Sequence, residues 1–67
     1  MLDKEIEFFK RHKEELKLVY HGKYIVIKGR NVLGAYNSHQ EAYNETIKDH
    51  AVGTFIIENL SAILKPN

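Results

Sequence analysis

The chain has 67 residues, 43% hydrophobic and 28% charged, and its ten basic residues nearly balance nine acidic ones. This length and composition indicate one small globular domain, and the absence of cysteine excludes disulfides, thiolate catalysis and zinc sites built on sulfur. The apolar runs are far shorter than the ~20 residues of a membrane span and no signal peptide is recognisable, so we expect a soluble, cytoplasmic protein without membrane contact.

The first predicted element is a helix over residues 2–20. At 100° per residue, one face collects Leu2, Phe8, Phe9, His12, Leu16, Val19 and Tyr20. Acidic residues precede basic ones along this segment, which suits the helix dipole. Gly22 is placed to end the helix in a left-handed conformation. Leu18 falls on the opposite face, where a single core does not explain it.

A β-hairpin is predicted next, with strands over 23–28 and 32–36, because both segments are rich in β-branched and aromatic residues. Tyr24 and Val26 lie on one side of the first strand, and apolar residues also occupy its other side. A sheet with one solvated face alternates between apolar and polar residues. This strand does not, so each of its faces requires a cover.

The turn of this hairpin leaves two registers open. Gly29 can adopt the positive φ that hairpin turns require. A two-residue loop pairs Ile27 with Val32, whereas a three-residue loop pairs Ile27 with Leu33. A slip of one residue exchanges the two faces of the strand, so the pattern does not decide which residues point inward.

A second helix is predicted over 39–50, beginning at a capping box. The Ser38 hydroxyl can accept from the Glu41 N–H, and the Glu41 side chain can reach back to the start of the helix. One face of this helix collects His39, Ala42, Tyr43, Thr46, Ile47 and His50.

A third strand over 54–58 and a semi-ordered tail over 59–67 complete the chain. The order α-β-β-α-β predicts a single α+β domain with a three-stranded, mainly antiparallel sheet of order 2-1-3, packed with two helices. The first helix covers either the face opposite the second helix or the same face beside it. In the latter case the bare face meets a second copy of the chain.

Part of the chain resembles a family of small prokaryotic domains of unknown function. The resemblance rests on Gly22-Lys-Tyr-Ile-Val-Ile, on Gly53-Thr-Phe-Ile-Ile, and on a "G-x-[YF]-[DN]-[ST]-x-x-[DE]-A" segment matched by Gly34, Tyr36, Asn37, Ser38, Glu41 and Ala42. It covers about residues 22–58. Where the family has a proline directly before the phenylalanine of the last strand, this chain has Ala51-Val52-Gly53. Gly22 as a helix cap, Gly34 as room for a helix or a bulge, and Ser38 with Glu41 as a capping pair have structural roles, so we expect the matched residues to serve the fold.

Members of that family are often encoded beside retropepsin-like aspartic proteases, and no catalytic residues are assigned to them. The resemblance therefore implies a third possibility for function, an accessory subunit of an adjacent protease.

No constellation of residues indicates catalysis, a cofactor or a metal ion. His39 and His50 share a helix face but lie about 16 Å apart, and His12 with Glu15 forms an i, i+3 pair without a third ligand. The sequence contains neither a phosphate-binding loop nor a dinucleotide-binding motif. A 67-residue chain also leaves little volume for an enclosed pocket, so we expect a protein that is not an enzyme.

Positive charge is concentrated in residues 8–30, which hold seven basic residues against two acidic ones. Lys23, Lys28 and Arg30 on the hairpin are candidates for nucleic-acid contact, which would make the protein an antitoxin-like regulator. The favoured alternative is a solvated helix face with edge-strand lysines that deter aggregation.

We expect a non-enzymatic, self-associating protein-interaction module, with a homodimer as its simplest form. Domains near this size bury little surface and often gain stability by oligomerising. Phe8, Tyr24 and Val26 are the residues predicted to form the contact, because they supply apolar surface on the first helix and on the two-sided strand.

Overall fold

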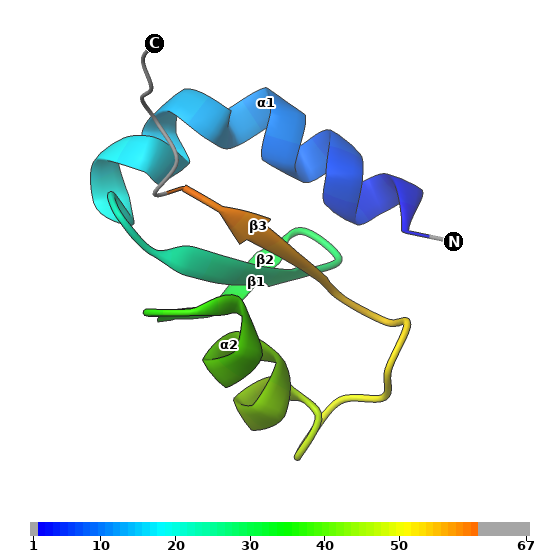
Figure 1. The fold of residues 1–67 in the computed structure, drawn as a ribbon. Coiled ribbons are helices and arrows are strands. Elements are labelled where there is room, and N and C mark those ends of the chain that lie inside the picture. The colour runs from blue at the N-terminus through cyan, green and yellow to red at the C-terminus, as the bar shows by residue number, and fades with distance from the viewer. Residues whose placement is uncertain (1, 61–67) are drawn as a thin grey trace, which may run out of the picture.

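The computed structural model describes residues 2–60 and has the predicted order of helix, two strands, helix and strand (Figure 1). The elements are α1 (Asp3–Val19), β1 (Tyr24–Lys28), β2 (Asn31–Tyr36), α2 (His39–Thr46) and β3 (Ile56–Asn59). The strands form one antiparallel sheet in the order β2-β1-β3. The predicted α+β class and strand order are confirmed.

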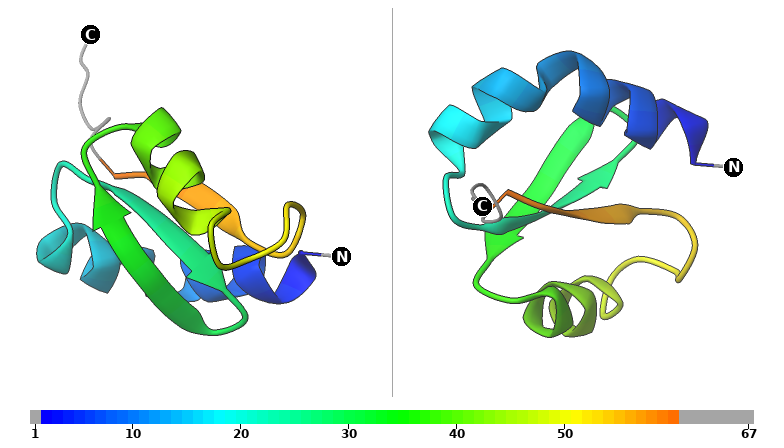
Figure 2. Two further views of the ribbon diagram at one scale, coloured as in Figure 1. Left: turned by 90° about the horizontal axis from the view of Figure 1, so that it is seen from below. Right: turned by 45° about the horizontal axis from the view of Figure 1, so that its top comes forward.

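The two helices lie on opposite faces of the sheet, so the molecule has three layers (Figures 1 and 2). On the α1 face, Ile25 and Ile27 of β1 pack with Leu16 and Leu60. On the α2 face, Val26 packs in a second cluster with Ala42 and Phe55. This arrangement explains why β1 is apolar on both sides, and it rules out the alternative in which both helices share one face.

The hairpin uses the two-residue loop. Ile27 pairs with Val32, and Lys28 pairs with Asn31, which leaves Gly29 and Arg30 in the turn. Gly29 has φ +66°, a left-handed conformation that glycine adopts without the steric cost of a side chain.

A β-bulge shifts the register farther along β2. Val26 pairs with Gly34 and Ile27 with Val32, so Leu33 is the extra residue on the edge strand. A Cβ atom on Gly34 would lie 2.8 Å from the Tyr36 hydroxyl. Glycine at this position therefore lets the Tyr36 ring lie close over the strand beside the bulge.

The helix α1 is interrupted at His12, whose φ of −110° and ψ of 15° are not helical. Residues of the predicted apolar face on both sides of the interruption, Phe8 and Phe9 before it and Leu16 and Tyr20 after it, nevertheless pack against one core cluster. Val19 was expected in the core, but 70% of it is exposed. Leu16, from the same predicted face, is buried in the core against the sheet.

The helix α2 begins where the capping box predicted but ends four residues early, at Thr46. The Ser38 hydroxyl accepts from the Glu41 N–H at 3.1 Å, while the Glu41 carboxylate accepts from the Asn37 N–H rather than from that of Ser38. Beyond Thr46 the chain turns, and the N–H of His50 still donates to the Thr46 carbonyl. The extension of α2 to His50 was wrong because the apolar spacing continues through a turn that is not helical.

The strand β3 starts two residues later than predicted and extends through Asn59. Thr54 belongs to the preceding turn, where its hydroxyl donates to the Ala51 carbonyl at 2.6 Å. The Leu60 N–H donates to the Lys23 carbonyl, and the Leu60 side chain is buried. The predicted tail is thus wrong at its first two residues, and residues 61–67 lie outside the described part of the chain.

Candidate functional site

The structure does not bring the three predicted contact residues together. Val26 has no exposed surface, because α2 covers its side of the sheet, and it is therefore unavailable to a partner. Tyr24 is half-buried with its ring edge-on to that of His39, at 6.5 Å between centroids. Phe8 packs against the core on the α1 face, across the sheet from Val26. The choice of Val26 is corrected, since this residue belongs to the core.

The three basic residues predicted to form a nucleic-acid contact on the hairpin lie in different surroundings. Lys23 donates to the Asn37 side chain at 2.8 Å, and Lys28 lies 3.1 Å from the Nδ1 of His50. Lys23 immediately precedes β1 and Lys28 is its last residue, so the two lysines lie about 16 Å apart along the extended chain. Arg30, in the turn, faces the N-terminal half of α1 instead. The three cations do not form one surface.

An exposed apolar surface lies at the C-terminal end of α1. Leu18 is 84% exposed and the neighbouring Val19 70%, the two highest values among the large apolar residues of the described chain. They border a shallow groove of about 490 Å³ that Glu15 flanks. We refer to its apolar lining residues as the Leu18 patch: Leu16, Leu18, Val19, Tyr20 and Val32.

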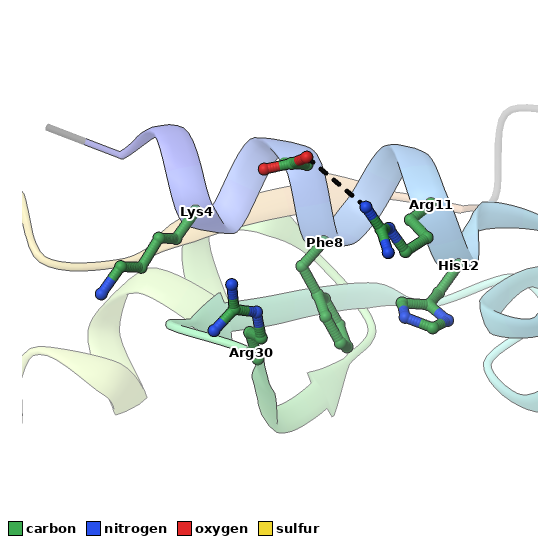
Figure 3. Close-up of a pocket in the computed structure, with 6 residues that line it drawn as sticks. Lys4, Phe8, Arg11, His12 and Arg30 are labelled. Atoms are coloured by element: carbon green, nitrogen blue, oxygen red, sulfur yellow. Dashed lines mark ion pairs between the residues drawn. The ribbon is translucent and has the colours of Figure 1, made fainter.

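A second, polar cavity of about 390 Å³ lies between the N-terminal half of α1 and the β1–β2 turn (Figure 3). We refer to it as the Arg30 cavity, and its lining residues are Lys4, Glu7, Phe8, Arg11, His12 and Arg30. Five of these come from α1 at helical spacing, and Arg30 reaches them from the turn. In Figure 3 the Phe8 ring lies between Arg30 and His12, while Arg11 points toward the Glu7 carboxylate, 3.6 Å away.

Glu5 connects α1 to this turn. Its side chain is buried, and its Oε2 accepts a hydrogen bond of 2.6 Å from the Gly29 N–H. That N–H, followed by the backbone N–H of Glu5 itself, lowers the pKa of the carboxyl more than burial raises it. The other oxygen, Oε1, is buried without a hydrogen-bond partner in the described structure. Glu5 therefore holds the Gly29–Arg30 turn against the helix.

Sequence reasoning missed Glu5, although a signal was present. Glu5 lies three residues after Leu2 and four before Phe9, within the predicted apolar face. A single acidic residue inside an apolar helix face indicates one of two things. Either the face has been assigned wrongly, or the carboxylate is buried with a specific hydrogen-bond partner.

The histidines of the described chain do not lie together in one site. His12 Nδ1 lies 3.0 Å from Glu15, the i, i+3 pair that the spacing indicated, and its ring contacts Phe8 at 4.7 Å between centroids. Within residues 2–60, no three His, Asp or Glu side chains are grouped so that they could hold a metal ion. No helix in the same range is long and apolar enough to cross a membrane.

Comparisons with family models, with curated proteins and with solved structures gave no match. The resemblance to the small prokaryotic family therefore stays a prediction, and the candidate surfaces rest on the geometry of this chain. These are the apolar Leu18 patch and the basic Arg30 cavity, at the two ends of α1.

Proposed function

We propose that the protein is a self-associating interaction module whose contact surface is the Leu18 patch. The observation that carries this proposal is the exposure of two adjacent large apolar residues, Leu18 at 84% and Val19 at 70%, beside an apolar groove. Contiguous apolar surface of this kind on a small protein typically marks a contact site.

The shape of the patch favours a second copy of the chain as its occupant. Leu18 protrudes, whereas Leu16 and Val32 are recessed in the adjoining groove. A two-fold contact places the same patch on both partners, so the protruding Leu18 of each copy fits the groove of the other. Glu15 lies at the border of the groove, and a polar border is usual for an apolar contact.

The neighbouring edge strand bears on which groups would form the contact. β2 contains no charged residue and no proline, but it carries a β-bulge, another device by which exposed edges avoid pairing. The bulge at Leu33 interrupts the regular edge of β2, so we assign the contact to the side chains of the patch rather than to backbone pairing between strands.

The size of the core supplies a reason for association. The buried apolar residues of the described chain number seven, divided between two clusters by the sheet. Domains with so small a core commonly depend on further burial between subunits.

The test is the mass of the protein in solution, measured by sedimentation velocity up to about 1 mM. We expect a concentration-dependent dimer for the parent chain and a folded monomer for Leu18→Asp. Val52→Asp is the matched control, because Val52 is 66% exposed but lies in the α2–β3 loop, far from the patch (Figure 1). A monomeric parent chain, or a Leu18→Asp variant that dimerises as the parent does, contradicts the proposal.

A further inference from the structure

The Arg30 cavity has no part in the proposed self-association, yet its composition is that of an anion site. We infer that this cavity binds a nucleotide through its phosphate group, with the base against the Phe8 ring. The inference is independent of the Leu18 patch, because the cavity lies on the N-terminal half of α1 and the patch at the C-terminal end.

The charge of the cavity selects an anion. Lys4, Arg11 and Arg30 are cations near neutral pH, and Glu7 is the single carboxylate in the lining. Glu7 meets Arg11 through one contact of 3.6 Å between exposed side chains, a weak pair that leaves most guanidinium donors available. Two arginines also supply the planar, forked donors that match phosphate oxygens.

The fold places the backbones of the three cationic residues around the cavity. α1 places Lys4 and Arg11 on one stripe, seven residues apart, and Arg30 faces them from the hairpin turn. The partly buried bond from the Gly29 N–H to Glu5 fixes the backbone next to Arg30 against the helix. The cavity is therefore a junction of two elements, and its charges are partly assembled before a ligand arrives.

The cavity also has an aromatic wall, which favours a nucleotide over inorganic phosphate. Phe8 is half-buried against the core, with its ring between Arg30 and His12 (Figure 3). Aromatic rings and guanidinium planes are the groups on which nucleic-acid bases stack. The volume of about 390 Å³ lies in the range of small-ligand sites.

The first experiment titrates the parent chain with AMP, followed by NMR chemical shifts and calorimetry. We expect saturable binding below about 10 mM AMP, with shifts at Phe8 and Arg30, and weaker binding of both adenosine and inorganic phosphate. Absence of binding, equal affinity for adenosine, or shifts located elsewhere on the molecule each overturn the inference. Equal affinity for inorganic phosphate overturns the role of the aromatic wall.

Two variants test the charges. Arg30→Ala is expected to weaken AMP binding about tenfold, while Lys23→Ala, which removes a cation of the same hairpin outside the cavity, leaves it unchanged. Glu7→Gln removes the carboxylate from the lining and is expected to tighten binding about threefold. An unchanged affinity for Arg30→Ala, or weaker binding by Glu7→Gln, contradicts the assignment.

A labelled single-stranded oligonucleotide distinguishes the source of the phosphate. If the oligonucleotide competes with AMP and loses affinity in Arg30→Ala, the cavity takes nucleotides of a nucleic-acid strand. If AMP binds and the oligonucleotide does not, the ligand is a free nucleotide. Both results support the nucleotide site. If the oligonucleotide binds the Arg30→Ala variant as tightly as the parent chain, the Arg30 cavity is not where the oligonucleotide binds, and this overturns its assignment as a site for nucleic-acid strands.

Discussion

At the scale of single residues, Glu5 shows how a polar group can be part of a core. The position faces the sheet, where a leucine would bury more apolar surface, yet the carboxylate accepts the Gly29 N–H and anchors the turn. Its second oxygen is left without a partner, an energetic cost that an apolar residue would avoid. The fold thus exchanges some core stability for a fixed turn beside Arg30.

The lowered pKa of Glu5 predicts a loss of stability in acid. A carboxyl with a depressed pKa in the folded state stabilises the fold above its ordinary value of 4.5, and that contribution is lost as the pH falls through the folded-state pKa. We expect Glu5→Gln to be less stable than the parent near neutral pH and to lose less stability below pH 4.5. Urea unfolding of both proteins from about pH 7 to about pH 3 measures how the free energy of unfolding of each depends on pH.

The control for this measurement is Glu7→Gln, in which an exposed carboxyl without a backbone partner is removed. Glu58 has the opposite effect on the pH dependence of stability. Burial raises its pKa more than the charge of Lys13 lowers it, so the stability that it contributes in acid is lost as the pH rises from 4.5 through its folded-state pKa. Parallel pH profiles for the parent and Glu5→Gln would contradict the assigned role of Glu5.

At the scale of elements, local signals were reliable where a specific hydrogen bond defines a boundary. Ser38 and Glu41 marked the beginning of α2 correctly, and the turn at Gly29 lay where its conformational freedom predicted. The end of α2 was missed because the apolar spacing, and even a helix-like bond from the His50 N–H to the Thr46 carbonyl, continue through a turn that is no longer regular helix. The faces of β1 could not be assigned from the pattern, since both are covered and either register buries apolar residues.

Loss of the α2 cap is expected to weaken the fold. Ser38→Ala removes the acceptor for the Glu41 N–H, and such substitutions cost about 1 kcal/mol of unfolding free energy. In a domain of this size that lowers the Tm by roughly 4–8 °C. Ser38→Thr retains the hydroxyl and serves as the control in thermal unfolding followed by circular dichroism. A Ser38→Ala variant as stable as the parent would show that the cap carries little energy.

The core position of Val26 gives a sharper element-level prediction. Val26→Ala deletes two buried methyl groups between β1 and α2, and we expect a loss of about 2 kcal/mol in unfolding free energy. Val52→Ala makes the same chemical change at an exposed position and should stay within about 0.5 kcal/mol of the parent. Equal effects in urea titrations would be inconsistent with the described packing.

At the scale of the whole molecule, the candidate surfaces were the least predictable feature. Both candidate surfaces depend on how α1 lies over the sheet and on which of its residues the sheet leaves uncovered. Val19 and Leu18 are both exposed, although the sequence pattern placed them on different faces of the helix. Arg30 joins Lys4 and Arg11 only through the tertiary contact of the turn with the helix, a relation absent from local spacing.

Self-association predicts a stability that depends on protein concentration. Only folded chains form the dimer, so a higher protein concentration favours the folded state. Raising the concentration from about 10 µM to about 500 µM should therefore increase the Tm of the parent by several degrees. The Leu18→Asp variant should melt at one temperature throughout this range, and Val52→Asp should behave as the parent. Calorimetry at both concentrations makes the comparison, and a parent Tm that does not move would argue against association.

The central position of β1 has a kinetic consequence. Both edges of this strand are paired, to β2 and β3, and both of its faces are covered by helices. Fraying of an edge or a terminal turn cannot bring the amides of Ile25, Val26 and Ile27 into contact with water all at once. Deuterium should therefore enter this triplet last, at a rate set by complete unfolding, so that three adjacent amides report the stability of the entire chain.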